Sequence, residues 1–174
     1  MALKSLTVNG QPVRGFKLDL LDYAVKLPFG TDAVPAVAGV ALEQTSTVTV
    51  TQATELPGVA TVTVTDNKDK DTVYTVSLAA MTVLDVMKLS LRIKSDAYDI
   101  EIQDLIDACL IDLNIAGVDK VDPDDALTMQ AIKIYCKANF GYDEHSDRFR
   151  EAYESLKKVM ALAREYEEDV IEVV

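Results

Sequence analysis

One histidine, two cysteines and two runs of acidic residues are the groups from which this sequence could build a reactive site. His145 lies among charged residues in a short connection, where a solvated loop or capping role outweighs catalysis. Cys109 and Cys136 lie in segments of helical apolar spacing, on faces shared with leucine and isoleucine, which predicts buried reduced thiols rather than a disulfide. So small an inventory gives no Ser-His-Asp or Cys-His set, and we predict no catalytic residues.

The acidic runs are weak candidates for a metal site or for a glycosidase carboxylate pair. They comprise Asp66, Asn67, Asp69 and Asp71 in one run and Asp119, Asp122, Asp124 and Asp125 in the other. Neither has the sixth-position glycine and twelfth-position glutamate of an EF-hand loop, so polar turns are the better interpretation. A glycosidase would also show aromatic platforms, yet aromatic residues make up 6% of the chain and tryptophan is absent. The glycine-rich phosphate-binding motifs are missing too, and we predict no enzyme activity, no metal and no cofactor.

The composition is that of a packed globular protein, with 174 residues, 49% hydrophobic content and 26% charged residues. A formal net charge of −12 disfavours tight binding along a nucleic-acid backbone or to an acidic membrane. The longest nearly apolar stretch, 34–42, is about half of what a membrane-spanning helix needs. The N-terminal segment lacks the apolar centre of an export signal, so we expect synthesis in the cytoplasm.

The sequence pattern changes near Met81. Residues 1–80 hold alternating threonine and valine separated by glycine, proline and asparagine, whereas the following residues have the 3.6-residue apolar period of helices. The first part carries 6 basic and 8 acidic residues and the second 11 basic and 21 acidic, which gives net charges of −2 and −10. We predict an all-β domain at 1–80, an all-α domain at 81–166 and a C-terminal tail at 167–174.

Six or seven short strands and no helix are predicted in the first domain. The candidates are residues 6–8, 23–27, 36–42, 47–51, 59–65 and 72–78. Because one sheet would leave an apolar face unburied, we predict a small antiparallel sandwich. The segments LTVNGQPVRGF, DYAVKLPFGT, STVTVTQATELPGVATVTVT and TVYTVSL resemble bacterial cadherin-like or immunoglobulin-like modules over residues 3–79. The resemblance implies a spacer or a weak glycan-binding module.

Four helices forming a bundle are predicted in the second domain. The first is capped by Thr82 and runs through Ile93. The second starts at 95 or 96 and ends at Gly117. The third has Asp122 as its N-cap and Pro123 as its first residue, and it ends at Gly141. Because it is apolar on several sides, the third helix is expected at the centre. The fourth is capped by Ser146.

The helical domain resembles the head-tail connector family of long-tailed phages, also described as head completion, adaptor or DNA-packaging proteins. The resemblance lies in DVMKLSLRIKSDAYDIEIQDLIDACLIDLNIAGV, DPDDALTMQAIKIYCKANFGYDE and DRFREAYESLKKVMALAREY, and it covers residues 81–174. It implies a structural virion protein at the neck, a ring of about a dozen copies that binds the portal and the next neck or tail-terminator protein. DNA would pass through this channel without tight binding, and the sandwich would project outward.

Acidic residues of the second helix are candidates for the channel wall. Asp99, Asp104, Asp107 and Asp112 lie mostly away from its apolar stripe and would repel phosphate. A solvated outer face is the alternative interpretation.

The C-terminal tail is a candidate for partner docking. Tyr166, Val170, Ile171, Val173 and Val174 would add to a sheet or fill a groove of a neighbouring protein, and fraying disorder is the alternative.

A second function class is a surface adhesion module, in which the sandwich binds glycan or a protein partner. That class normally requires an export signal, and none is visible, so the virion interpretation is preferred.

Overall fold

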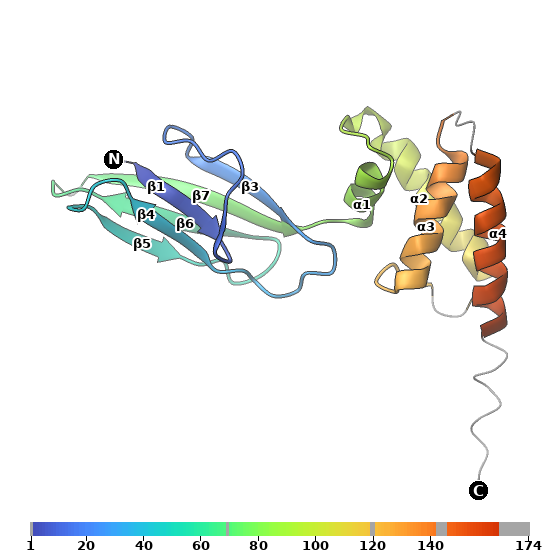
Figure 1. Ribbon diagram of the computed structural model, residues 1–174. Coiled ribbons are helices and arrows are strands. Elements are labelled where there is room, and N and C mark those ends of the chain that lie inside the picture. Colours follow the sequence, from blue (N-terminus) through green and yellow to red (C-terminus); the bar gives the residue numbers. More distant parts are fainter. Residues whose placement is uncertain (1, 69, 119–120, 142–145, 164–174) are drawn as a thin grey trace, which may run out of the picture. The chain divides into compact units, whose positions relative to one another are not determined.

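The chain divides into two compact units, Met1–Met81 and Thr82–Val174, in a computed structural model that describes residues 2–68, 70–118, 121–141 and 146–163. We call them the β unit and the helical unit, and Figure 1 shows the strands in the first and the helices in the second.

The described part of the β unit, residues 2–68 and 70–81, forms two sheets. Its strands are β1 (Leu3–Val8), β2 (Gln11–Pro12), β3 (Asp22–Leu27), β4 (Val37–Ala41), β5 (Thr47–Thr51), β6 (Gly58–Thr65) and β7 (Asp71–Ala80). The smaller sheet has the order β2-β1-β4 and the larger the order β3-β7-β6-β5. Each of the predicted strand segments lies within or overlaps one of these strands.

Alternation of side chains places valine inside and threonine outside. In β6, Ala60, Val62 and Val64 are fully buried, and the threonines between them face outward. The register with β5 pairs Val62 with Val50 and Thr63 with Thr49, so each face keeps one residue type across both strands. The expected half-buried strands are confirmed.

One pairing corrects the prediction of a purely antiparallel sandwich. β3 runs parallel to β7, with Tyr23 opposite Val76, whereas the other pairs are antiparallel. After β3 the chain crosses to the smaller sheet to form β4, and it then returns through the β5-β6 hairpin. β7 runs antiparallel to β6 along one edge. Along its other edge it pairs with β3, which runs in the same direction as β7.

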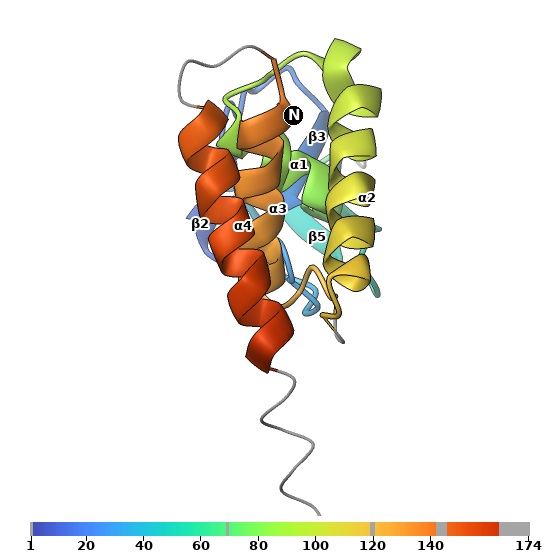
Figure 2. The same cartoon turned by 90° about the vertical axis from the view of Figure 1, so that its right-hand side faces the viewer.

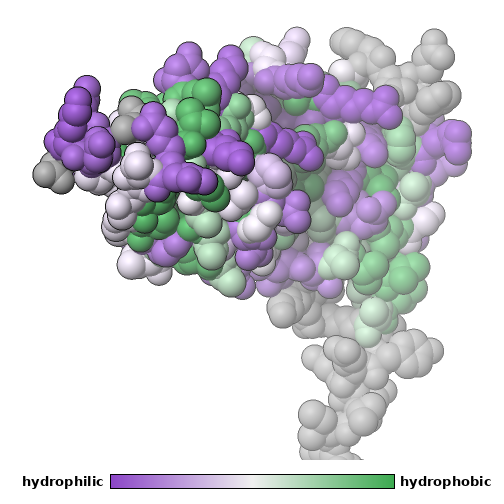
Figure 3. Space-filling model, turned by 60° about the vertical axis from the view of Figure 1, so that its left-hand side comes forward, coloured by the Kyte–Doolittle hydropathy of each residue, from purple (hydrophilic) through white to green (hydrophobic). Residues whose placement is uncertain are grey.

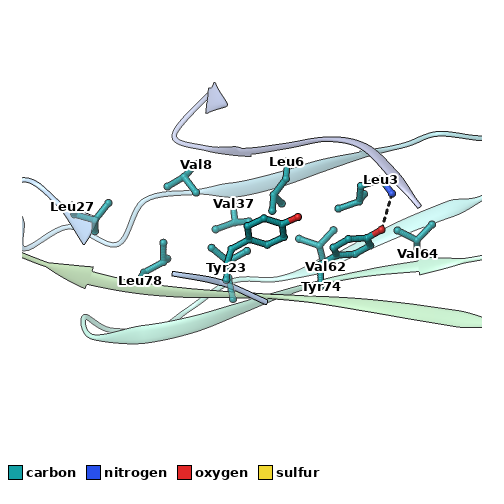
Figure 4. Packing of buried hydrophobic residues seen from close by; sticks show 12 residues of the cluster. Leu3, Leu6, Val8, Tyr23, Leu27, Val37, Val62, Val64, Tyr74 and Leu78 are labelled. Carbon is teal, nitrogen blue, oxygen red and sulfur yellow. Dashed lines mark hydrogen bonds between the residues drawn. The ribbon is translucent and has the colours of Figure 1, made fainter. Parts of the chain in front are cut away.

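The two sheets share one core, in which the side chains of both meet (Figure 4). The backbone N–H of Leu3 in the smaller sheet donates to the hydroxyl of Tyr74 in the larger one, at 3.1 Å. A Cβ on Gly39 would come within 2.8 Å of the Val62 side chain, so glycine permits the close approach of the sheets there. Gln52, directly after β5, accepts from the N–H of Val37 at 2.8 Å and donates to its carbonyl at 2.7 Å. This amide supplies partners for the edge of β4.

In its described residues the helical unit contains four helices and one short 3-10 turn. They are α1 (Val83–Ser90), η1 (Asp96–Tyr98), α2 (Asp99–Ile115), α3 (Ala126–Asn139) and α4 (Ser146–Ala163). α3 packs against α1, α2 and α4. Figure 2 shows α3 between α2 and α4, and the central position predicted for the third helix is confirmed.

Local hydrogen bonds explain where the helices begin and end. Thr82 and Asp85 form a reciprocal capping box at the start of α1, as expected from Thr82. The predicted end at Ile93 is wrong, because α1 ends at Ser90 and Arg92 adopts a left-handed φ of 60°. The start predicted at Asp122-Pro123 is also wrong: Asp125 caps α3 by accepting from the N–H of Thr128 at 2.8 Å.

Candidate functional site

A polar network joins α2 to α4 inside the helical unit. The hydroxyl of Tyr153 donates to the Asp112 carboxylate at 2.6 Å, and the amine of Lys157 donates to the same oxygen at 2.9 Å. Lys157 also reaches Glu154 at 2.9 Å. These bonds place a carboxylate of one helix against two donors of another, which fixes α4 relative to α2.

The network changes the ionisation of its members. The hydrogen bond from Tyr153 and the bond and charge of Lys157 outweigh burial, and they hold the pKa of Asp112 below its ordinary value. Burial and then the neighbouring carboxylate raise the pKa of Tyr153. For Lys157 burial acts in the opposite direction, but hydrogen bonds to Glu154 and Asp112 prevail and raise its pKa. At neutral pH the arrangement is a carboxylate, a neutral hydroxyl and an ammonium.

The two cysteines are buried beside this network. Both are free thiols, and Cys109 lies with its Sγ 3.8 Å from the Tyr153 hydroxyl. Burial raises the pKa of the Cys109 thiol to about 11 and that of Cys136 to about 12. Because only the thiolate is nucleophilic, thiols that stay protonated at neutral pH are unreactive. The two side chains therefore pack as small apolar groups.

The four carboxylates predicted to face a channel lie in two different environments. Asp99 pairs with the amine of Lys88 at 2.6 Å, and Asp112 belongs to the network above. Asp104 and Asp107 are exposed, and Asp107 accepts from the Gln103 amide at 2.9 Å. Two of the four therefore hold helices together, and two lie on the surface.

Exposed isoleucines accompany those two surface carboxylates. Ile100, Ile111 and Ile115 are 80%, 58% and 79% exposed, although α2 also has a buried apolar face. Sequence reasoning assigned only acidic character to this outer face and missed the isoleucines. Their spacing could have indicated this feature. Ile111 and Ile115 follow Ile100 by eleven and fifteen residues, which places all three on one side of a helix.

A second exposed apolar pair lies on α4, where Val159 is 61% and Leu162 is 58% exposed. Apolar side chains in line on a helix surface are typical of a protein contact. The β unit too has hydrophobic side chains at its surface among hydrophilic ones (Figure 3).

The acidic runs form turns or caps where they are described. Asp66 accepts from the backbone N–H groups of Lys70 and Lys68, and these bonds lower its pKa. Across the described stretches, no three His, Cys, Asp or Glu side chains gather as metal ligands would. None of the helices in those stretches has both the length and the apolar content to span a membrane.

Some of the predicted candidate residues lie outside the described part of the chain. They are His145, Asp69, Asp119 and the tail residues Tyr166, Val170, Ile171, Val173 and Val174.

The four helices of this unit lie in the segment that matches a known protein family. Residues 83–167 match the model of the phage connector protein family. The matched segment, which we call the connector region, begins where α1 begins and includes α2, α3 and α4. No curated protein matches the chain.

The connector region carries the coarse functional conclusions. This family is structural rather than catalytic, and it suggests a head-tail connector role, a place in the virion and assembly with other head or tail proteins of a phage. The match does not include the β unit. The resemblance of that unit to cadherin-like or immunoglobulin-like modules stays a prediction.

Proposed function

We propose that this chain is a head-tail connector of a tailed phage, of which about a dozen copies form a ring below the portal. The ring extends the DNA channel and joins the head to the tail, with the β unit as an outward decoration. The observation that carries this proposal is the family match, which takes in all four helices of the helical unit.

The charge of the chain supports passage of DNA rather than binding. Residues 81–174 hold 11 basic and 21 acidic groups. A duplex has a charge for about every 1.7 Å of its axis, so a wall with this excess of carboxylates repels it and lets it slide.

Rigid packing in the helical unit supports a load-carrying ring. Ile102, Ile106 and Leu113 of α2 and Ile132 of α3 are no more than 1% exposed. The Asp112–Tyr153–Lys157 network adds directional bonds between α2 and α4. Such a unit keeps its shape when neighbours bind to it.

The decisive experiment is electron microscopy of purified virions or of portal-neck complexes. We expect a symmetric ring of helical units directly below the portal. A matched control is a phage that lacks the gene, which should give heads and tails that do not join until the wild-type gene is supplied. Virions in which the protein is absent from the neck would overturn the proposal.

A further inference from the structure

The outer face of α2 combines apolar and acidic side chains in one stripe. Successive helix positions rotate by about 100°, so Ile100, Asp104, Asp107, Ile111 and Ile115 lie within about 80° of one another. All five are exposed. The buried side chains Ile102, Ile106, Cys109 and Leu113 lie on the opposite side of the helix. We call this set the α2 stripe.

The outer face of α4 has a stripe of the same kind with the opposite charge. Arg148, Ala152, Ser155, Val159 and Leu162 follow one another at steps of three or four residues and are all exposed. The charged member of this stripe is the cation Arg148, and the exposed Glu151 lies beside the stripe. The buried residues Tyr153 and Met160 face inward. We call this set the α4 stripe.

The two stripes lie on separate sides of the helical unit. α3 packs against both α2 and α4, which also meet through the Asp112–Tyr153–Lys157 network, whereas the two stripes point away from the buried faces of their helices. α2 and α4 run in the same direction while α3 runs against them (Figure 2). A rotation about an axis parallel to these helices would therefore set α2 of one copy alongside α4 of the next, with both chains pointing the same way.

The stripes also match in spacing. Asp104 precedes Ile115 by eleven residues, and Arg148 precedes Val159 by eleven residues. Eleven residues are almost a whole number of turns, or about 16 Å along each axis. When two parallel helices place Asp104 opposite Arg148, Ile115 comes opposite Val159. One alignment thus forms an ion pair and an apolar contact together.

We propose that the α2 stripe of one copy packs against the α4 stripe of a second copy of this chain. The inference rests on the proposed ring and names the surfaces that build it. Two different faces that complement each other make a head-to-tail contact, which adds copy after copy and forms the proposed ring when the rotation closes. Asp104 then lies between copies, and not on the channel wall.

The charge pattern favours a second copy over other occupants. Phosphate surfaces are repelled by the carboxylates of the α2 stripe, and a purely apolar partner would leave Asp104 buried without a cation. The α4 stripe supplies a cation at the position that the eleven-residue spacing requires.

Cysteine cross-linking tests the predicted alignment. In the full-length chain carrying Ile115→Cys and Val159→Cys, mild oxidation of a concentrated solution should give a ladder of covalent oligomers, because each copy offers both thiols. The native cysteines are buried and should not contribute. The matched control carries Ile115→Cys with Gln130→Cys, an exposed position on α3, and should give no ladder. Equal ladders in both variants, or none in either, would overturn the proposed contact.

Charge exchange gives the second test, with sedimentation equilibrium as the readout. Asp104→Arg alone or Arg148→Asp alone should weaken self-association by at least about tenfold, because like charges then face each other. The double variant, or an equal mixture of the two single variants, should restore it to within about threefold. Asp32→Arg, an exposed site in the β unit with the same change of charge, is the control and should have no effect. Unchanged association in all variants, or a wild-type chain that stays monomeric at every concentration, contradicts the contact.

The same variants separate this inference from the proposed function. A neck ring that persists in virions carrying Asp104→Arg would eliminate the α2-α4 contact and leave the connector role intact. Absence of the wild-type protein from the neck would eliminate the connector role, whatever the chain does in solution.

Discussion

The buried tyrosines of the two units have different partners. In the β unit, the hydroxyl of Tyr23 lies 2.8 Å from the carbonyl oxygens of Lys17 and Leu20, which are neutral backbone groups. In the helical unit, the hydroxyl of Tyr153 donates to the Asp112 carboxylate. The β unit is thus held by backbone pairing and apolar packing, whereas the helical unit depends in addition on ionised side chains.

This difference extends to the surfaces. Net charges of −2 for residues 1–80 and −10 for the rest give the helical part the stronger long-range field. Exposed threonines cover the outer strand face at β5, while α2 exposes isoleucine and aspartate in line. Both units expose large apolar side chains, but Ile100 and Ile115 of α2 are the most exposed among the described residues and lie in line with carboxylates, so the comparison points to α2 as the face that a partner covers.

The largest effects are expected from cavities in the two cores. Leu6 in the β unit and Ile106 in the helical unit are each 1% exposed. Leu6→Ala and Ile106→Ala should each lower the free energy of unfolding of their own unit by about 2–5 kcal/mol, from lost transfer energy and the cavity left behind. Urea unfolding followed by circular dichroism should show each substitution moving one transition. If either substitution moves both transitions equally, the two units unfold as one, and the comparison fails.

Removal of one hydroxyl from each unit is the next largest test. Tyr153→Phe should cost about 1.5–3 kcal/mol, because its partner is charged, and Tyr23→Phe about 0.5–1.5 kcal/mol, because its partners are neutral. Partial exposure of the Asp112 side chain, 37%, places the first value near its lower end. Equilibrium unfolding of the two variants measures both costs, and equal losses would contradict a special role for the carboxylate.

The elements of the fold were predictable where local spacing determined them. Valine and threonine alternate as in 62–65 only when a strand has one buried face, and Ile102 and Ile106 mark a helix face in the same way. The parallel pairing of β3 with β7 was not predictable, because it joins segments that are distant in sequence, and local alternation does not select a distant partner.

The candidate site, too, was predictable from the sequence only in part. Asp104 was found from its place opposite the apolar stripe, and it is exposed as that place implies. The network of Asp112 with Tyr153 and Lys157 combines residues of two helices, so no spacing within one segment indicates it. The isoleucines of the α2 stripe were visible in the sequence, but an apolar residue on a charged face shows its exposure only once the neighbouring helices are in place.

Acid should sharpen the contrast between the two tyrosines. The pKa of Asp112 is lowered in the folded protein, so the stability that it contributes is present above its unfolded pKa of about 3.9 and is lost as the pH falls through the folded value. The cost of Tyr153→Phe should therefore shrink between about pH 5 and pH 2, while that of Tyr23→Phe stays constant, because a backbone carbonyl does not ionise there. Thermal unfolding of both variants across this range is the measurement. A cost of Tyr153→Phe that is the same at both ends would mean that Asp112 is not its partner.

The smallest expected changes in the free energy of unfolding come from replacing one threonine in each unit. Thr82 caps α1: its side chain accepts from the N–H of Asp85 at 3.2 Å, and Asp85 in return accepts from the N–H of Thr82 at 2.9 Å. Thr82→Ala should cost about 1 kcal/mol, because a helix N–H loses its acceptor. Thr49→Ala on the exposed face of β5 should stay within about 0.5 kcal/mol, because it changes an outward surface position. Thr82→Ser restores the acceptor and should recover most of the loss in urea unfolding of the helical unit. Were Ser no better than Ala, the hydroxyl would not be the stabilising group, and side-chain packing at the start of α1 would have to account for the loss.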